Sequence, residues 1–231
     1  MAEDKEKSPI RVVTVTMSDT RKRSNDESGR ALVEELTLGG VKHVRHVILK
    51  EEPRFLQELV RSVSTDNVAD AMVITGGTGI TPRDTTYEAL KEIFDKDIAG
   101  FGETFRRLSW DEIGPHSILS RASAGVVNEC LVFSLPGSTR AVCLGVRALI
   151  LPILHHAVDL AMGRATHVPA PPSGSLLPNY SPSMSSPSMS QALSPALAPK
   201  VSEAPAPSGQ TSPVPPHPSQ KPTSRPRTDE D

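Results

Sequence analysis

Short apolar runs alternate with longer stretches of helical periodicity over the first 164 residues. Four of these runs are rich in β-branched residues and predict strands at residues 10–17, 44–50, 70–75 and 130–135. Between them, one helix is expected to open near Ser28 and to stop at Gly39 and Gly40, and Pro53 suits the first turn of another. Pro152 interrupts the last apolar run and should kink a helix or restart it. Because strands and helices alternate, we expect parallel pairing and an α/β fold, a three-layer sandwich with a mostly parallel central sheet.

The carboxyl ends of the four expected strands lead into loops rich in polar residues and glycine. These loops cover residues 18–29, 50–52, 76–84 and 136–141. In open parallel sheets, ligands bind beyond the carboxyl ends of the strands. We therefore expect all four loops to open on one rim of the sheet and to form a single binding site.

The third of these loops belongs to the sequence VITGGTGITPRD, residues 73–84. Glycine has no Cβ, so the N–H groups of Gly76, Gly77, Thr78 and Gly79 can curl around an anion, and phosphate is the first candidate ligand. A P-loop is excluded because no Gly-Lys-Ser/Thr follows, and the spacing is not that of the dinucleotide-binding fingerprint. Taken alone, glycines after a strand are also typical of a simple tight turn.

Two other loops place small residues at expected helix N-termini. Ser28 and Gly29 precede one helix, and Gly137, Ser138 and Thr139 precede another. Unpaired N–H groups and the positive end of the helix dipole favour phosphate at such positions. These five residues are therefore candidate anion-binding residues.

Acidic residues accompany the glycine loop. Asp84 follows it directly, and Glu51 and Glu52 follow the second expected strand. Carboxylates suit a Mg²⁺ ion that also holds substrate phosphates, so Asp84 is a candidate metal ligand, with Glu51 as a second candidate catalytic acid. The structural alternatives are that Asp84 caps the helix near Thr85, which has capping-box spacing to Glu88, and that the two glutamates are solvated first-turn acids.

The last quarter of the chain has a different composition. Residues 169–231 hold 16 of the 22 prolines and a tandem SPSMS repeat. Ordering these 63 residues would cost about 60 kcal/mol of backbone entropy, whereas their nine large apolar side chains could return at most roughly 27 kcal/mol. We expect a flexible N-terminus over 1–9, one domain over 10–164 and a disordered Pro/Ser-rich tail over 165–231.

Charge and cysteine content narrow the function. The formal net charge of −2 does not indicate binding to nucleic acid or to an anionic membrane. The basic run at residues 21–23 is interpreted as a solvated loop. Cys130 and Cys143 form neither a disulfide framework nor a metal-type spacing. The N-terminus lacks the apolar core of a signal peptide, and no run approaches the roughly 20 apolar residues of a membrane span. We expect a reduced, soluble, cytoplasmic protein that binds a small ligand.

Five motifs in order carry a family resemblance: TVTMSDTRKRSNDESG, TGGTGITPRDTTYEAL, GFGETFRRLSWDEIG, SRASAGV and LPGSTRAV, over roughly residues 11–163. In these motifs the chain resembles the MoaB/MogA proteins of molybdenum cofactor biosynthesis and the related gephyrin G domain. The third motif and the PGST sequence look more like the MoaB branch. The resemblance implies the molybdopterin-binding fold of this family.

The resemblance also implies an activity. Active members are molybdopterin adenylyltransferases, in which the terminal phosphate of molybdopterin attacks the α-phosphate of ATP with Mg²⁺ and releases pyrophosphate. Asp84 matches the acid after the glycine loop of active members, and the glycine loop and the 137–139 loop match binding loops. Asp19, Ser28 and Gly29 are weaker candidates for the pterin-phosphate end. A homotrimer or a dimer of trimers is implied, and other cofactor-biosynthesis proteins are possible partners.

One position departs from the pattern of the resemblance. Adenylyltransferases of the MogA and gephyrin type carry an aspartate after the second strand, where this chain has Glu51 and Glu52. A glutamate reaches one methylene further than an aspartate and can still bind a metal. The alternative to an enzyme is therefore an inactive molybdopterin-binding or scaffold protein, whose PVPPHP segment at 213–218 recruits a partner as a polyproline helix.

Overall fold

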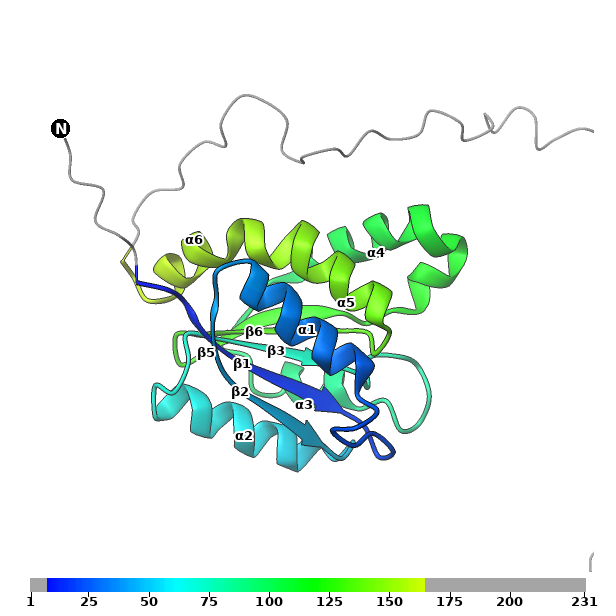
Figure 1. Cartoon of the computed structure of the whole chain (residues 1–231), viewed down its shortest axis with the longest axis horizontal. Coiled ribbons are helices and arrows are strands. Elements are labelled where there is room, and N and C mark those ends of the chain that lie inside the picture. The colour runs from blue at the N-terminus through cyan, green and yellow to red at the C-terminus, as the bar shows by residue number, and fades with distance from the viewer. Residues whose placement is uncertain (1–7, 165–231) are drawn as a thin grey trace, which may run out of the picture. The chain divides into compact units, whose positions relative to one another are not determined.

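A computed structural model of the chain describes residues 8–164. The predicted tail, 165–231, and residues 1–7 of the predicted flexible N-terminus lie outside the described residues. The described part contains a six-stranded sheet in the order β2-β1-β3-β6-β5-β4 (Figure 1). Its strands are β1 (Arg11–Met17), β2 (Lys42–Leu49), β3 (Ala71–Thr75), β4 (Lys96–Asp97), β5 (Ser123–Val127) and β6 (Cys130–Leu135).

Pairing in this sheet is mostly parallel, as predicted. The four strands expected from the sequence, β2, β1, β3 and β6, are parallel neighbours, whereas β5 and β4 extend the sheet with antiparallel pairs. These last two strands were not predicted from the sequence. β4 has two residues, and β5 joins β6 through a hairpin turn at Asn128 and Glu129, both at positive φ. Tight hairpin turns need positive φ, but this pair lacks the usual glycine signal.

Helices cover both faces of the sheet. One face carries α1 (Glu27–Leu38), α4 (Ala99–Ile113) and the run formed by α5 (Thr139–Gly145), the π-turn η2 (Val146–Ile150) and α6 (Leu151–Ala161). The opposite face carries α2 (Pro53–Thr65) and α3 (Thr86–Lys91), and a 3₁₀ turn η1 (Gly114–Leu119) follows α4 (Figure 1). The three-layer α/β sandwich is therefore confirmed.

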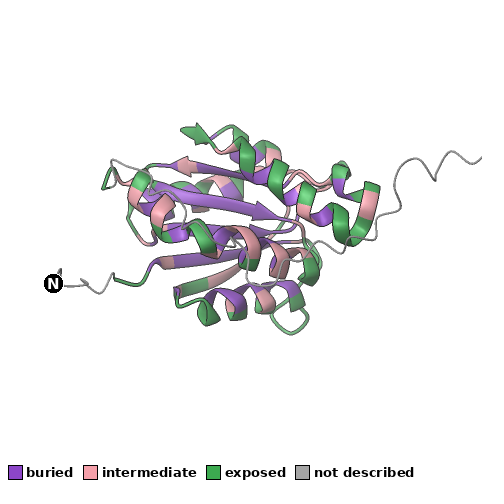
Figure 2. Ribbon diagram, turned by 90° about the horizontal axis from the view of Figure 1, so that it is seen from above, coloured by how far each residue is buried: buried purple, intermediate pink, exposed green. Residues whose placement is uncertain are grey.

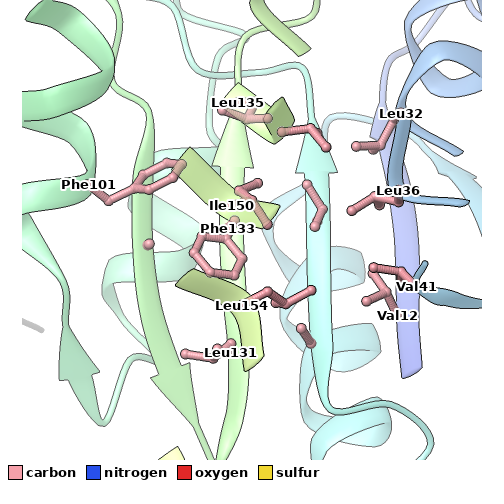
Figure 3. Close-up of a cluster of buried hydrophobic side chains, with 14 of the residues drawn as sticks. Val12, Leu32, Leu36, Val41, Phe101, Leu131, Phe133, Leu135, Ile150 and Leu154 are labelled. Carbon is pink, nitrogen blue, oxygen red and sulfur yellow. The ribbon is translucent and has the colours of Figure 1, made fainter. Parts of the chain in front are cut away.

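The alternating side chains of the strands divide the interior into two cores. Val12 of β1 packs toward α1, and the next residue, Val13, packs toward α2; both are fully buried. The central strands are buried along their length (Figure 2). In the core on the α1 side, the rings of Phe101 and Phe133 meet with centroids 5.3 Å apart and planes inclined at 55° (Figure 3).

The last helical run contains the break expected at Pro152. Proline lacks an N–H and its ring clashes with the carbonyl four residues earlier, so a regular helix cannot pass through it unchanged. The wider π-turn over Val146–Ile150 accommodates it, and α6 begins with the proline in its first turn. A stripe of residues spaced four apart still faces the sheet throughout this run: Val142, Val146, Ile150, Leu154 and Val158.

The same run bears on the expectation that no segment approaches the length and apolar character of a membrane span. Thr139–Ala161 spans 23 residues, and an 18-residue window within it has a mean hydropathy of 1.8, which by length and composition is enough to cross a membrane. About a third of its most apolar window is buried within the fold, and that buried stripe belongs to the core on the α1 side. Its opposite face exposes apolar side chains, among them Ile153 and Leu160.

Of the helix-end predictions at Gly39 and Thr85, only the first is confirmed by the structure. α1 ends at Gly39, whose N–H donates to the carbonyl of Glu35 at 3.0 Å, as predicted. The capping box predicted at Thr85 and Glu88 is wrong. The Thr85 side chain makes no capping hydrogen bond, and the Glu88 carboxylate binds the guanidinium of Arg121 instead.

Replacement of the buried Phe133 by alanine tests the core. Phe133→Ala removes a fully buried ring and its contact with Phe101, and we expect a loss of about 3–5 kcal/mol in the free energy of unfolding. Urea denaturation measures this loss. Phe55→Ala on α2 is the matched control, because Phe55 is 49% exposed and should lose less than about 1 kcal/mol. Equal losses in the two variants would contradict the packing described.

Candidate functional site

A pocket of about 460 Å³ opens at the carboxyl ends of the parallel strands. All four predicted loops reach it, and a wall from α4 and η1 closes one side. The lining residues are Thr16, Met17, Ser18, Arg21, Ser28, Glu51, Thr75, Gly76, Gly77, Thr78, Gly79, Asp84, Phe105, Ser109, Ile113, His116, Ser120, Pro136, Gly137, Ser138 and Ala141. Its size is within the range of sites for small organic ligands.

The glycine loop after β3 requires glycine at its first two positions. Gly76 has φ +99°, and a Cβ there would lie 2.3 Å from the carbonyl oxygen of Met17. Gly77 has φ +64°, and its Cβ would lie 2.3 Å from Oγ1 of Thr86. Side chains are disfavoured at positive φ and have no room here. The chain therefore turns sharply at the end of β3 and passes close to β1.

Several amides of this loop remain free. The Gly76 N–H donates to the carbonyl of Leu135 at 3.0 Å. By contrast, the amides of Gly77, Thr78 and Gly79 donate to no acceptor within residues 8–164. Free N–H groups in successive residues at a pocket wall form an anion-binding concavity. The geometry thus supports a ligand loop over a simple turn.

Asp84 does not cap α3. Its Oδ2 accepts a hydrogen bond from the N–H of Thr81 at 2.8 Å, which folds the carboxylate back onto the glycine loop. A Cβ at Gly79 would lie only 2.7 Å from the same oxygen. Oδ1 accepts no hydrogen bond from the described residues and belongs to a side chain that lines the pocket. One carboxylate oxygen therefore shapes the loop, and the other is available to a ligand.

The two glutamates after β2 take different positions. Glu51 lines the pocket, whereas Glu52 stands at the start of α2 and makes no side-chain capping hydrogen bond. Burial raises the pKa of Glu51, and the negative charges of Asp84 and Asp19 raise it further, while Arg83 opposes them. The pocket thus brings acids close enough to repel one another, which is an arrangement that a cation relieves.

Asp19 does not line the pocket but joins two of its loops. Its Oδ1 accepts from the N–H of Glu51 at 3.3 Å, and its Oδ2 accepts from Arg83 Nε at 3.1 Å and from Arg83 Nη2. The hydrogen bond from Arg83 lowers the pKa of Asp19. This ion pair connects the loop after β1 to the loop after β3.

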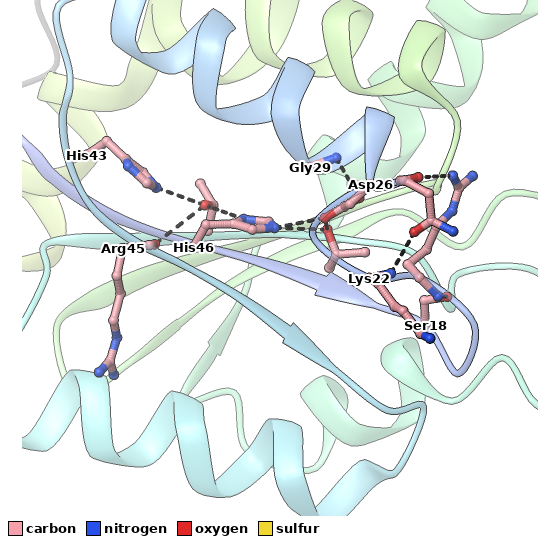
Figure 4. A network of polar contacts seen from close by, with 11 residues as sticks. Ser18, Lys22, Asp26, Gly29, His43, Arg45 and His46 are labelled. Carbon is pink, nitrogen blue, oxygen red and sulfur yellow. Dashed lines mark hydrogen bonds and ion pairs between the residues drawn. The ribbon is translucent and has the colours of Figure 1, made fainter.

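Ser28 and Gly29, predicted together, separate in the structure. Ser28 lines the main pocket, but Gly29 faces a neighbouring cavity of about 410 Å³. The Gly29 N–H donates to Asp26 Oδ1 at 2.9 Å, so that amide is already used (Figure 4). Asp26, which the sequence analysis did not single out, is the residue that caps α1.

Asp26 is the centre of a buried polar network (Figure 4). Its Oδ2 accepts from Thr16 Oγ1 and from His46 Nε2, each at 2.9 Å, and the other nitrogen of His46 lies 2.8 Å from Thr14 Oγ1. An ionised carboxylate can only accept, so Nε2 of His46 carries the proton. Burial by itself would raise the pKa of Asp26, but hydrogen bonds from His46, Gly29 and Thr16 lower it overall.

The loop after β6 contributes two of its three predicted residues. Gly137 and Ser138 line the pocket, whereas Thr139 lies in a groove beside Arg140 on the α4 side. Oγ of Ser138 accepts from the N–H of Ala141 at 3.2 Å and caps the helical run that starts with α5. This helix N-terminus therefore adds further backbone donors to the rim.

The wall formed by α4 and η1 was not predicted from the sequence. Phe105, Ser109, Ile113, His116 and Ser120 line this side, although the motif containing α4 carried the family resemblance. Nothing in their spacing distinguishes a pocket wall from an ordinary helix face. Arg21 also reaches the pocket, although its basic run was interpreted as a solvated loop.

The fold and the site define an α/β protein with a candidate ligand pocket at the carboxyl ends of its parallel strands. The family model described as "Probable molybdopterin binding domain" matches residues 12–156, and the chain belongs to this family. Molybdenum cofactor biosynthesis protein B of Bacillus subtilis is 43% identical over 159 residues, which cover 68% of this chain and 94% of the relative. The corresponding protein of Staphylococcus aureus (strain MRSA252) is 40% identical over 152 residues, 64% of this chain and 90% of the relative.

Solved structures agree with this assignment. A crystal structure of molybdenum cofactor biosynthesis protein B has a TM-score of 0.65 and 41% identity, and covers 68% of this chain and 98% of its own. The tungsten cofactor synthesizing protein MoaB of Pyrococcus furiosus has a TM-score of 0.61 and 35% identity, over 68% and 99%. A MogA structure has 27% identity and a TM-score of 0.60, over 65% and 99%. The predicted membership of the MoaB branch is thus confirmed.

Asp26→Asn tests the polar network that fixes α1. The substitution keeps the shape but removes the charge that accepts three hydrogen bonds, and we expect a loss of about 2–3 kcal/mol in unfolding free energy at pH 7. The folded-state pKa of Asp26 is lowered, so its contribution is complete above about pH 4 and is lost as the pH falls through the folded value. Urea denaturation at pH 7, 5 and 3.5 should show the two proteins converging at acid pH.

Asp66→Asn is the control for this series, since Asp66 is exposed at the end of α2 and should leave stability within about 0.5 kcal/mol of wild type. A difference between wild type and Asp26→Asn that does not change with pH would contradict an ionised Asp26 in this role.

Proposed function

We propose that this protein is a molybdopterin adenylyltransferase that uses Mg-ATP. In the proposed reaction, an oxygen of the terminal phosphate of molybdopterin forms a bond to the α-phosphorus of ATP. The bond from that phosphorus to its bridging oxygen breaks, and pyrophosphate leaves with the electron pair. The observation that carries the proposal is the set of free amides at Gly77, Thr78 and Gly79, which share one pocket with Asp84 and Glu51.

This arrangement suits phosphoryl-type transfer. Such reactions need positioning of the two phosphates and stabilisation of negative charge more than a reactive side chain. Fixed backbone N–H groups supply that stabilisation without reorganising during the reaction. We assign the glycine loop to the triphosphate and the helix N-terminus at Gly137 and Ser138 to the second phosphate.

The acids fit a role in holding Mg²⁺. No group of three or more His, Cys, Asp or Glu side chains within residues 8–164 is placed to enclose a metal. Mg²⁺ is commonly held by one or two carboxylates together with substrate phosphates, which matches Asp84 and Glu51 at one pocket. When bound, the ion would neutralise charge on the transferring phosphate. The extra methylene of Glu51 lets its carboxylate reach toward Asp84 from the end of β2.

The remaining candidates take supporting roles in this proposal. Ser28 lines the pocket and is assigned to the pterin-phosphate end. Asp19 acts through its hydrogen bonds with the Glu51 amide and Arg83, and Gly29 acts by leaving room for the Asp26 cap. Other cofactor-biosynthesis proteins and a cytoplasmic location belong to the same proposal, because the substrates are ATP and a biosynthetic intermediate.

A pyrophosphate-release assay with molybdopterin, ATP and Mg²⁺ tests the activity. Asp84→Asn keeps the size of the side chain but removes a charge at the metal position, and we expect at least a hundredfold lower turnover with the fold retained. Asp97→Asn is the matched control. Asp97 pairs with Lys91 at the surface, and its loss should leave turnover within about twofold.

The same assay separates the enzyme from the alternative. Turnover that persists after deletion of residues 165–231 supports catalysis by the domain itself. Binding of molybdopterin without turnover in the wild-type protein would support the inactive binder, for which the glutamate at position 51 is the favouring observation. Normal turnover in Asp84→Asn would remove that residue from its proposed role.

We also propose a homotrimer or a hexamer built of two trimers. The support is the apolar outer face of Thr139–Ala161, where Ile153 is 42% and Leu160 is 43% exposed. Light scattering should give three or six times the chain mass of 24.8 kDa. Ile153→Glu should lower the measured mass, whereas Arg54→Glu on α2, on the other face of the sheet, should not. A monomer mass for the wild-type protein would contradict the proposal.

A further inference from the structure

The directions of the free amides in the glycine loop are set by hydrogen bonds to the carbonyl oxygens of the same peptide groups. A trans peptide is planar, so the carbonyl of one residue and the N–H of the next point in opposite directions. Fixing a carbonyl therefore fixes the direction of the following amide. The carbonyls of residues 76–79 determine where the amides of residues 77–80 point.

Each of these four carbonyls has a protein donor. Oγ1 of Thr86 donates to the carbonyl of Gly76, and the N–H of Thr86 donates to that of Gly77, both at 3.0 Å. The N–H of Arg121 donates to the carbonyl of Thr78 at 3.0 Å, and its Nε donates to that of Gly79 at 2.7 Å. Thr86 thus holds the first half of the loop. Arg121 holds the second half, at Thr78 through its own main-chain N–H and at Gly79 through its guanidinium.

Arg121 is well held in this position. Its Nη2 donates to the carbonyl of Asp84 at 2.7 Å, its Nη1 pairs with Glu88, and its guanidinium lies 5.4 Å from the centroid of the Tyr87 ring. The side chain is only 26% exposed. One guanidinium therefore connects Gly79 to Asp84. Only a planar fork of several N–H donors can bind these two carbonyls and the Glu88 carboxylate at the same time.

Neither Arg121 nor Thr86 is among the residues that line the pocket, so neither is placed to contact the ligand. We propose that Arg121 is a positioning residue whose guanidinium holds the end of the glycine loop at Gly79 and the main chain at Asp84, so that the loop and the Asp84 carboxylate face bound phosphate. Thr86 directs the amides of Gly77 and Thr78. This inference rests on the proposed function insofar as the ligand carries a phosphate group. It assigns a role to the SRASAGV motif, whose single arginine has no part in the chemistry itself.

Binding of inorganic pyrophosphate with Mg²⁺ to the full chain, measured by isothermal titration calorimetry, tests this inference. Arg121→Lys keeps the charge but not the fork of donors, and we expect at least tenfold weaker binding, with a larger loss for Arg121→Ala. Millimolar guanidinium should restore part of the affinity of Arg121→Ala, by at least threefold. A role in overall stability alone would not give this rescue.

Two further substitutions locate the effect. Glu88→Gln removes the ion pair but leaves the hydrogen bonds from Arg121 to the loop carbonyls, so its affinity should stay within twofold of wild type. Thr86→Val loses the donor to the Gly76 carbonyl and should weaken binding, whereas Thr86→Ser should restore it. Guanidinium should not rescue Thr86→Val. These variants test the same loop from its other end if Arg121→Ala fails to fold.

The outcomes are distinct. Folded Arg121 variants that bind pyrophosphate with wild-type affinity would overturn the inference and leave the proposed function standing. Affinity lost equally in Glu88→Gln would also overturn it, because the surface ion pair would then account for the effect. Failure of the wild-type protein to bind pyrophosphate would overturn the inference and the proposed function together.

Discussion

The site depends on the sharp turn of the chain at the end of β3, where the backbone has room only for glycine. Gly76 passes so close to the carbonyl of Met17 that no side chain fits, and its φ of +99° excludes most other residues. From there, each peptide plane is fixed by a hydrogen bond to its carbonyl, and the free amides lie on the opposite side. The parallel sheet brings the other loops to the same rim.

Residues around the pocket partly neutralise the negative charge of its carboxylates. Burial raises the pKa of Glu51, the nearby charges of Asp84 and Asp19 raise it further, and Arg83, which pairs with Asp19, offsets part of this repulsion. At the neighbouring helix start, Asp26 is buried but satisfied by three donors, so its charge stabilises α1. Residual repulsion is therefore confined to the place where a cation is proposed to bind.

Much of this arrangement could be predicted from the sequence. Runs of β-branched residues predicted the four parallel strands. Because the carboxyl ends of parallel strands meet at one edge of a sheet, their loops were predicted to lie together. Residue types and positions alone also predicted that Asp84 and the glycine loop belong to one site. By contrast, β5 lacks an alternating pattern, β4 is too short to give one, and the capping box at Thr85 failed because Arg121 competes for the Glu88 carboxylate.

Long-range contacts account for the rest. Nothing near Arg121 in the sequence indicates that its side chain reaches residues 79 and 84, because that contact depends on the pairing of β5 with β6, which itself lies next to β3. Likewise, Asp26 meets His46 only because β1 and β2 are neighbours in the sheet. A spacing rule within one segment cannot find such pairs.

The most direct measurement is a nuclear magnetic resonance titration of the full chain, labelled with ¹⁵N at glycine and threonine, with pyrophosphate and Mg²⁺. If the amides at the end of β3 grip phosphate, the resonances of Gly77, Thr78 and Gly79 should move strongly downfield, while those of Gly39 and Gly163 stay in place. Binding that shifts other amides and leaves these three unchanged would contradict the account.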